Sequence, residues 1–304
     1  MRPYLLFISG IAGLAGMAMA ESPSIVSVVI AGIPCFLGYG LGQALTDVFQ
    51  TDTDAISSAY RPLVKGEISK TAVFVVSLTG LMLTLPVFAL LNPLIVLPCT
   101  GAIVGLVLYT PLKRHWWSGP PWNSMIVALL PLMGFMAISP APLFSADSLP
   151  LIYTLLAVFF AYANFVVGGY FKDIAADRKT GYHTVQVRFG WRAAAVYGDI
   201  LSVLAFAFTA LAVLPAIIGG GFTGIGALAL LLVTGGINAI SQIRLHAIRD
   251  EARSHGPITG IVRSFILYCS LIVFAHQPQW GPGLVAYYCL FETALFMRPE
   301  ESQV

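Results

Sequence analysis

Charge is the scarcest feature of this sequence of 304 residues. Asp, Glu, Lys and Arg make up only 10% of it and leave a net charge of +2, whereas about 25% of an average soluble domain is charged. A soluble domain of this length needs far more polar surface, and a nucleic-acid-binding protein needs a strongly basic one. The lack of charge therefore excludes an ordinary soluble enzyme, a disordered chain and a nucleic-acid partner.

Cysteine is also rare. The four cysteines, Cys35, Cys99, Cys269 and Cys289, all lie in apolar stretches. None has the CxxC or Cys/His spacing of a metal site or a redox motif. We therefore expect them to be small buried side chains and not a disulfide framework.

Hydrophobic residues are abundant: they make up 58% of the chain, and the mean hydropathy is +0.84. A helix needs about 20 mostly apolar residues to cross a bilayer, and an unpaired sheet edge cannot lie there. We therefore predict an all-α, polytopic, integral membrane protein that forms one membrane domain over residues 1–304. The nine expected spans, and a shorter tenth that carries Glu292, are 3–20, 24–46, 71–91, 93–110, 122–140, 149–170, 193–217, 222–241, 258–276 and 282–297.

The first of these spans has an alternative interpretation. Its end, Ala18-Met19-Ala20, is similar to the small-residue cleavage site of a signal peptide. Because the apolar run is long for a signal peptide, we expect a retained helix.

Positive charges are confined to one set of connections. Nearly all Lys and Arg residues lie in the stretches 47–70, 111–121, 171–192 and 242–257, or near the chain ends. The positive-inside rule therefore places these loops and the N-terminus in the cytoplasm. The membrane would be a bacterial inner membrane or an organelle membrane.

Two acidic clusters stand at the ends of expected spans on this charged side. Asp47, Gln50 and Asp54 share one face if the second helix continues through them, and Asp173 and Asp177 share a face at the end of the sixth. Such carboxylates can be solvated caps paired with Lys and Arg. Two clusters at equivalent helix ends favour a binding site instead, because Mg²⁺ prefers one or two carboxylates together with substrate phosphates.

Basic residues are mixed with these carboxylates, namely Arg61, Lys65, Lys113 and Lys172. Such side chains can contact diphosphate oxygens. Carboxylates, Mg²⁺ and a basic rim at the mouth of an apolar bundle indicate a substrate with a diphosphate head and a long hydrocarbon tail, bound within the lipid bilayer.

The motifs resemble those of the UbiA-type superfamily of intramembrane prenyltransferases, which carry NDxxDxxxD after the second helix and DxxxD after the sixth. Asp173-x-x-x-Asp177 matches the second motif, and the stretches 54–66, 109–114 and 184–190 are similar to the segments that accompany the two motifs. In the first motif this sequence departs from the pattern: Thr46 replaces the family Asn, and Gln50 replaces the central Asp.

The resemblance implies an all-α bundle of nine helices around a central cavity. It also implies Mg²⁺-dependent transfer of a prenyl group from a prenyl diphosphate donor to a hydrophobic acceptor, aromatic or lipid. Asp47 and Asp54 would bind one Mg²⁺, and Asp173 and Asp177 the other. Lys113 and Lys172 would add positive charge, while Arg61 would order its loop or bind phosphate.

Three intramembrane side chains are expected to face the cavity. The ring faces of Tyr39 and Tyr162 would stabilise an allylic carbocation, although ordinary packing is the alternative for any aromatic residue in such a bundle. Asn164 precedes Asp173 by nine residues and would contact substrate, the alternative being a hydrogen bond between helices.

Two other functions stay open at this point. A terpene cyclase on the same scaffold would ionise the diphosphate without an acceptor, and the Gln50 departure is compatible with it. A transporter or lipid-binding protein is the non-enzymatic alternative. Charges that gather at one membrane face, and not at the midplane, disfavour transport.

Overall fold

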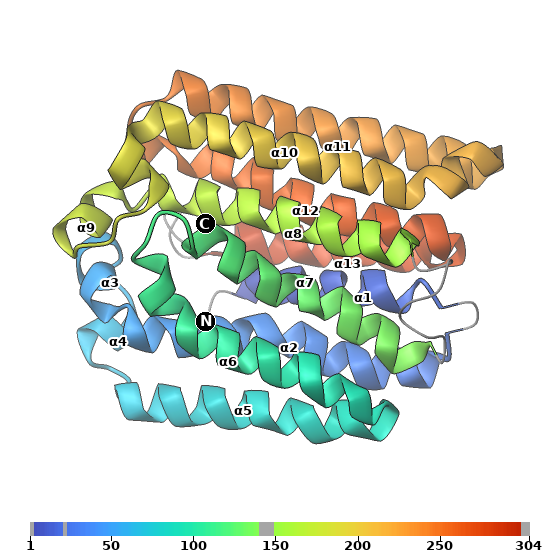
Figure 1. The fold of residues 1–304 in the computed structure, drawn as a ribbon, viewed down its shortest axis with the longest axis horizontal. Coiled ribbons are helices and arrows are strands. Elements are labelled where there is room, and N and C mark those ends of the chain that lie inside the picture. Colours follow the sequence, from blue (N-terminus) through green and yellow to red (C-terminus); the bar gives the residue numbers. More distant parts are fainter. Residues whose placement is uncertain (1–2, 21–22, 140–148, 299–304) are drawn as a thin grey trace.

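The computed structural model describes residues 3–20, 23–139 and 149–298. These ranges are almost entirely helical and contain no β-strand, and the long helices lie side by side as a bundle (Figure 1). The α-helices are α1 (Leu6–Met17), α2 (Ile25–Phe49), α3 (Thr51–Ser57), α4 (Pro62–Lys65), α5 (Lys70–Leu91), α6 (Val96–Lys113), α7 (Gly119–Ile138), α8 (Leu149–Tyr170), α9 (Ile174–Lys179), α10 (Val185–Gly219), α11 (Gly221–Ala247), α12 (His255–His276) and α13 (Gly281–Phe296). Short 3₁₀ turns, η1 (Pro3–Leu5), η2 (Pro93–Ile95), η4 (Glu251–Arg253) and η5 (Pro278–Trp280), precede α1, α6, α12 and α13.

Eight helices of the described chain are long and apolar enough to cross a membrane, namely α2, α5, α6, α7, α8, α10, α11 and α12. They confirm the all-α membrane bundle and eight of the expected spans. The first and the tenth expected spans are the shorter helices α1 and α13. α10 begins before residue 193 because it includes a short segment that ends in a kink at Gly190, where φ is 83°. The break expected at 141–147 lies outside the described residues.

Helix α1 is part of the core. It packs against α2, α7 and α12, and Leu5, Ile8 and Ile11 at its start are almost completely buried. The crossing with α7 is so close that a Cβ atom added at Gly16 would stand 1.8 Å from the carbonyl oxygen of Pro131. Helix α1 is therefore an integral part of the helical bundle.

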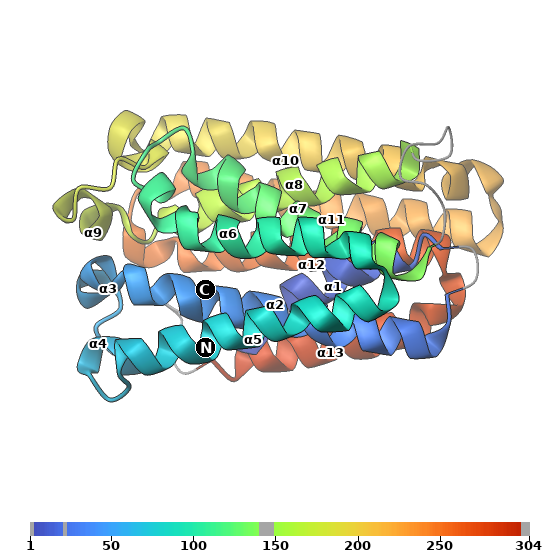
Figure 2. The ribbon, with the colours of Figure 1, turned by 60° about the horizontal axis from the view of Figure 1, so that its bottom comes forward.

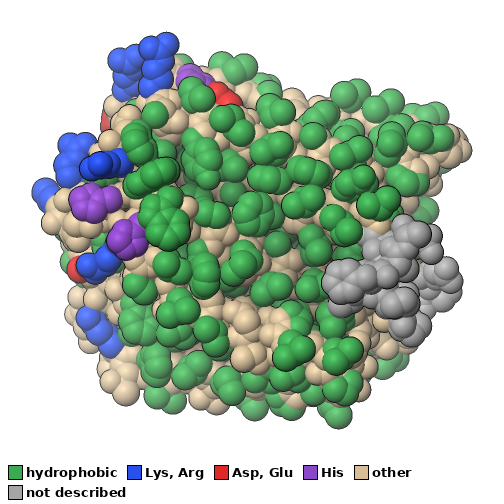
Figure 3. All heavy atoms as spheres, viewed as in Figure 1, with side chains coloured by type: hydrophobic (Ala, Val, Ile, Leu, Met, Phe, Trp, Pro, Cys, Tyr) green, Lys and Arg blue, Asp and Glu red, His purple; other side chains and the backbone are tan. Residues whose placement is uncertain are grey.

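Polar side chains gather at one end of the bundle. The short helices α3, α4 and α9 lie there in both ribbon views (Figures 1 and 2). The charged and histidine side chains visible in Figure 3 lie mostly toward the same end, while hydrophobic side chains cover most of the rest of that face. Among the exposed apolar residues are Leu90, Phe222 and Phe296, each more than 80% exposed. An apolar exterior along the long helices suits a bundle whose sides face the hydrocarbon core of a bilayer.

The two acidic clusters occupy equivalent junctions in the chain. Gln50 separates α2 from α3 with φ/ψ of −114°/19°, and Asp173 stands before α9, shortly after α8, with φ/ψ of −115°/12°. The second helix therefore does not continue through its motif, as the spacing argument assumed, but stops at Gln50 and restarts. α3 and α9 pack together, and the hydroxyl oxygens of Thr53 and Thr180 lie 3.2 Å apart between them. This contact brings the two motifs together.

Candidate functional site

The first acidic motif is organised around a guanidinium group. Arg61, in the loop before α4, donates from one Nη to Asp54 and lies 3.3 Å from an oxygen of Asp47. Gln43, one helical turn before Asp47, donates to that aspartate at 2.6 Å. The side chains of Asp47 and Asp54 are 20% and 11% exposed. The break at Gln50 therefore does not separate the two aspartates, because one arginine contacts both.

The second acidic motif pairs a buried aspartate with a more accessible one. Asp177 is completely buried and accepts a hydrogen bond from Thr184 at 3.4 Å. Asp173, at the start of α9, is partly exposed. Burial raises the pKa of Asp177 to about 6; the charge of Lys113 opposes this rise and that of Asp173 adds to it. A carboxylate that is costly to ionise in the free protein is a frequent feature of functional sites.

Lys113, at the end of α6, connects the two motifs. Its Nζ lies 3.2 Å from Oε1 of Gln50 and 3.7 Å from Oδ1 of Asp177. The side chain is 7% exposed, and its ammonium lies about 5 Å from the ring centres of Tyr170 and Tyr182. The Gln50 amide also donates to Thr110 at 3.4 Å. The residue that replaces the family aspartate is thus hydrogen-bonded on both sides.

These motifs line one pocket, which we call the polar pocket. Of the residues predicted from the sequence, it is lined by Tyr39, Asp47, Gln50, Asp54, Arg61, Lys113, Tyr162, Lys172 and Asp173. Asp177 does not line the pocket itself, but it forms an ion pair with Lys113, which does. Both motifs and three basic side chains therefore meet in one place.

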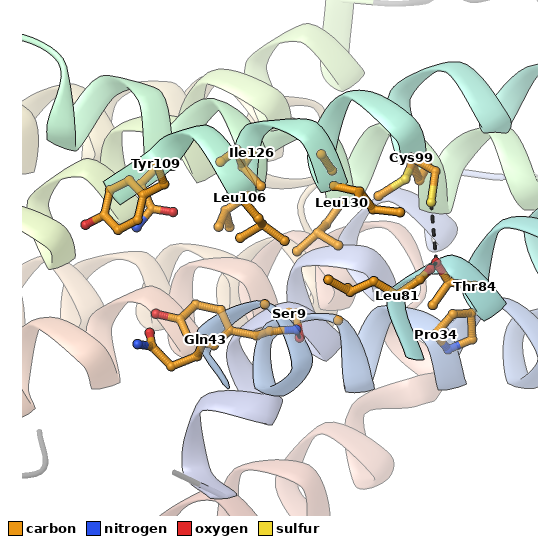
Figure 4. A pocket seen from close by; sticks show the side chains of 18 of the residues that line it. Ser9, Pro34, Gln43, Leu81, Thr84, Cys99, Leu106, Tyr109, Ile126 and Leu130 are labelled. Carbon is orange, nitrogen blue, oxygen red and sulfur yellow. Dashed lines mark hydrogen bonds between the residues drawn. The ribbon is translucent and has the colours of Figure 1, made fainter. Parts of the chain in front are cut away.

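A second space, which we call the apolar cavity, adjoins the polar pocket and lies within the bundle between α2, α5, α6 and α7 (Figure 4). Gln43 and Tyr109 lie at one end of it, and Pro34, Thr84 and Cys99 lie at the other. The residues that line both spaces are Tyr39, Gln43, Tyr109, Asn123 and Tyr162. A molecule with a charged head and an apolar tail could therefore occupy both.

Tyrosines mark the boundary between the two spaces. Tyr162 donates a hydrogen bond to the Tyr39 hydroxyl at 2.7 Å, and their rings meet edge to face with centroids 6.0 Å apart. The Tyr109 and Tyr170 hydroxyls lie 3.0 Å apart. Phenol rings at this boundary lie beside the point where head and tail of such a molecule would join.

Two predicted site residues lie elsewhere. Lys65 is exposed, and its ammonium lies 3.8 Å from Glu67. Asn164 is 1% exposed and does not line the polar pocket. It donates to Asn238 at 3.2 Å and accepts from Gln242 at 2.7 Å. The structure thus places Asn164 in hydrogen bonds that join α8 to α11.

Sequence reasoning missed some side chains of the site. Gln43 precedes Asp47 by one helical turn and was detectable as a polar residue within an apolar span. Tyr109 belongs to a stretch that was noted only for its resemblance to a family segment, yet it and Asn123 both line the two spaces. Their position follows from how α6 and α7 pack, which the spacing within one helix does not reveal.

The aspartates of the two motifs suit a metal ion that is also coordinated by a bound substrate. In residues 3–20, 23–139 and 149–298, no three His, Cys, Asp or Glu side chains converge so as to hold a metal ion without other ligands. Mg²⁺ is usually held by one or two carboxylates, water and substrate phosphates. Each aspartate pair matches that donor set, so the residues present suit an ion that binds together with a phosphorylated ligand.

Comparison with known proteins gives consistent results. Residues 6–256 match the model of the UbiA prenyltransferase family. The digeranylgeranylglyceryl phosphate synthase of Pyrococcus abyssi is 24% identical over 278 residues, which cover 90% of this chain and 95% of that protein.

Solved structures share the fold. A UbiA homologue from Aeropyrum pernix in its apo state superposes with a TM-score of 0.72 at 18% identity, covering 90% of this chain and 98% of the homologue. A homologue from Archaeoglobus fulgidus bound to GPP and Mg²⁺ superposes with a TM-score of 0.63 at 20% identity, covering 89% and 95% of the two chains.

Proposed function

This chain belongs to the UbiA prenyltransferase family, and on that premise we propose that it transfers a prenyl group from a polyprenyl diphosphate to a hydrophobic acceptor within the membrane, with Mg²⁺ as cofactor. The observation that carries the proposal is that the polar pocket and the apolar cavity adjoin and share Tyr39, Tyr109 and Tyr162 in their linings. A prenyl diphosphate suits both spaces, because its head is a strong anion and its tail is hydrocarbon. Residues 1–304 would act as one membrane domain.

The four aspartates would hold the metal with the diphosphate. Asp173 and Asp177 form one pair of ligands, and Asp47 and Asp54 the other. Mg²⁺, which accompanies GPP in the Archaeoglobus fulgidus homologue, would neutralise the negative charge that develops on the departing diphosphate. The proposal leaves out Lys65 and Asn164, since neither lines the polar pocket.

Basic side chains would bind the diphosphate oxygens directly. Arg61, Lys113 and Lys172 all line the polar pocket, and charge-assisted hydrogen bonds to phosphate oxygens are stronger than neutral ones. Lys113 has little exposure to water, so its charge would be weakly screened. These contacts stabilise the leaving group most when its charge is fully developed, which favours ionisation of the allylic carbon–oxygen bond.

The tyrosines would stabilise the allylic carbocation that remains after the diphosphate has departed. Tyr162 is 1% exposed, and its hydroxyl is engaged by Tyr39, so it would present a ring face and not a free nucleophile. A cation above such a ring gains about 2 kcal/mol or more when desolvated. The acceptor would then attack the allylic carbon, and the site would pass the proton lost by the acceptor to water.

The polar pocket would open to the cytoplasm. The charged loops between spans lie at the end of the bundle that holds α3, α4 and α9 (Figure 1), and positively charged loops face the cytoplasm in most membrane proteins. Cysteines introduced singly at Lys65 and at Gly220, in opposite connections, would test this with an impermeant thiol reagent. The proposed orientation requires that the reagent labels the Gly220→Cys variant in intact cells. It should label the Lys65→Cys variant only after the membrane has been permeabilised.

A direct test combines the purified protein, Mg²⁺ and radiolabelled prenyl diphosphates with candidate acceptors. The name of the Pyrococcus abyssi relative places glyceryl phosphate lipids first among these acceptors, followed by aromatic acids. Label that moves into an acceptor lipid supports the proposal. Diphosphate release with a cyclic hydrocarbon product, and no prenylated acceptor, would indicate a cyclase. No turnover with any donor would overturn both enzymatic functions.

A further inference from the structure

A third space, which we call the loop pocket, lies at the end of the bundle that holds α9 (Figure 1). It is formed by α9, the start of α10 and the connection between α11 and α12, and its polar and aromatic lining consists of Arg178, Gln186, Trp191, Arg249, Asp250 and Glu251. Its volume is about 410 Å³, within the range of small-molecule sites. Among the described residues, none that lines the loop pocket also lines the polar pocket. The proposed diphosphate site therefore does not account for it.

Two arginines of the loop pocket have no partner. Arg178 of α9 and Arg249, which follows α11, are both exposed. Within residues 3–20, 23–139 and 149–298, neither guanidinium group forms a hydrogen bond or an ion pair. A guanidinium group can bind phosphate through two parallel hydrogen bonds, and basic pockets on the cytoplasmic side of membrane helices bind lipid head groups. These two side chains are therefore available to an anion.

Two carboxylates share the loop pocket with the arginines. The two side-chain oxygens of Glu251 lie 3.1 and 3.2 Å from the backbone nitrogen of Ala175, in the first turn of α9. Asp250 accepts through Oδ1 from the backbone nitrogen of Ala252 at 3.0 Å, while its Oδ2 accepts no hydrogen bond from the described part of the chain. The lining thus carries both signs of charge with neither in excess. A purely anionic ligand would meet carboxylates as well as arginines.

Gln186 adds a buried acceptor that lacks a donor. Its side chain is 1% exposed and lines the loop pocket. The amide nitrogen donates to the carbonyl oxygen of Val167 in α8 at 2.7 Å, which fixes the orientation of the amide, but Oε1 has no hydrogen-bond partner among the described residues. A buried acceptor without a donor costs free energy. A ligand that satisfies every polar group of this pocket therefore brings a hydrogen-bond donor as well as an anion.

We propose that the loop pocket binds an aminoalkyl phosphate, a zwitterion with a phosphate and a primary ammonium group, such as the head group of phosphatidylethanolamine. The phosphate would lie between Arg178 and Arg249. The ammonium group, which has three N–H donors, would donate to Oε1 of Gln186 and to Oδ2 of Asp250. The same chemistry occurs in a membrane lipid and in the soluble compound O-phosphoethanolamine, so the experiment has one arm for each source.

The first arm measures which lipids stay bound to the full chain. The chain is incorporated into phosphatidylcholine nanodiscs that contain equal amounts of phosphatidylethanolamine and phosphatidylglycerol, and the lipids that remain after mild extraction are counted by native mass spectrometry. Phosphatidylglycerol has no ammonium group, and the ammonium group of phosphatidylcholine has no N–H donor. Relative to its share of the membrane, phosphatidylethanolamine should be retained about tenfold more than either, the effect of one charge-assisted hydrogen bond. A preference for phosphatidylglycerol would overturn the inference.

Substitutions assign the retained lipid to the loop pocket. Arg178→Gln and Arg249→Gln should each lower retention of phosphatidylethanolamine about tenfold. Arg188→Gln is the matched control and should not, because Arg188 is an exposed arginine of α10 that does not line the pocket. Asp250→Asn keeps an acceptor for Ala252 and removes the charge, so it should lower the preference over phosphatidylglycerol. All four side chains are exposed, and an unchanged melting temperature reports that each variant is folded. Unchanged retention in both test variants, or an equal loss in the control, would overturn the inference.

The second arm titrates O-phosphoethanolamine into the chain in detergent, by calorimetry, with inorganic phosphate as the comparison. Binding of the soluble compound that Arg249→Gln weakens, without any lipid preference, would identify a soluble ligand of the proposed class. A lipid preference without binding of the free compound would identify the lipid. Inorganic phosphate that binds as tightly as O-phosphoethanolamine would overturn the inference, since the ammonium group would then contribute nothing. Equal retention of the three lipids together with no binding of O-phosphoethanolamine would overturn it as well.

Discussion

Gln50 accepts a hydrogen bond from Lys113 through its side-chain oxygen, at 3.2 Å, and the same ammonium lies 3.7 Å from Asp177 in the other motif. One lysine thus joins the acidic motifs that follow α2 and α8. The amide of Gln50 keeps an oxygen in this position without a negative charge. The departure from the family motif therefore preserves the contact to Lys113 but lowers the negative charge available to a cation in the first motif.

Replacing Gln50 by aspartate should strengthen cation binding in the polar pocket. A third carboxylate beside Asp47 and Asp54 raises the charge that attracts Mg²⁺. We expect Gln50→Asp to lower the Mg²⁺ concentration for half-maximal donor binding several-fold, as measured by titration at a fixed donor concentration. Gln50→Asn, which keeps an amide, is the control and should not lower it. A collapse of donor binding in Gln50→Asp would show that the amide itself is required.

Removing one carboxylate from either motif should abolish Mg²⁺-dependent turnover. We expect Asp54→Ala and Asp173→Ala to lose more than 99% of the rate, about 3 kcal/mol of transition-state stabilisation. Asp52→Ala is a matched control, because Asp52 belongs to the same short helix as Asp54 but points to Arg114 at 3.4 Å, outside the polar pocket. Near-normal turnover in either test variant, with label transfer as the assay, would refute the site assignment.

The sequence predicted the parts of the site that depend on spacing within one helix or loop. Asp173 and Asp177 stand four residues apart, and the polar end of the bundle follows from where charges occur along the chain. The DxxxD motif therefore needed no knowledge of neighbouring helices. The break at Gln50 was not predicted, since no Pro or Gly marks it, but the loop arginine Arg61 still brings both aspartates together.

Contacts between distant segments could not be predicted in the same way. Asn164 was assigned to the cavity by its distance from Asp173, but the rotation of α8 turns it to Asn238 and Gln242. Glu292, in the last predicted span, accepts two hydrogen bonds from Arg263. The Nε atom and one Nη atom of the arginine each donate to it at 2.7 Å. Such partners depend on helix packing, which hydrophobic periodicity alone does not determine.

The Tyr162 ring should contribute to ionisation of the donor. Tyr162→Leu removes the ring, and loss of a desolvated cation–π contact of about 2 kcal/mol corresponds to a roughly 30-fold slower chemical step. Tyr162→Phe keeps the ring and removes only the hydrogen bond to Tyr39, so its rate should fall less than fivefold. Single-turnover kinetics with bound donor measure this step. Equal losses in the two variants would assign the effect to the hydroxyl.

As the pH is lowered, Mg²⁺ binding should begin to weaken at a higher pH than is usual for aspartate ligands. The pKa of Asp177 is raised to about 6, mainly by burial, and a metal must displace the proton from a protonated ligand. Apparent Mg²⁺ affinity, measured by calorimetry with donor present, should therefore be constant above pH 7 and fall as the pH drops below about 6. The charge of Lys113 lowers this pKa, so Lys113→Gln should move the fall to higher pH. An unchanged affinity down to pH 5 would contradict the prediction.

The ion pair of Arg263 and Glu292 should stabilise the attachment of α13 without affecting the site. It joins α12 to α13 with two parallel hydrogen bonds, and neither residue lines the polar pocket. Glu292→Gln leaves the arginine without its charged partner in an apolar setting, which is costly. We expect a lower melting temperature in detergent, by roughly 2–4 °C for about 1 kcal/mol, with unchanged donor binding. The double variant Arg263→Met/Glu292→Leu removes both charges and should recover most of the loss. A double variant less stable than Glu292→Gln would show that Arg263 is anchored by other contacts.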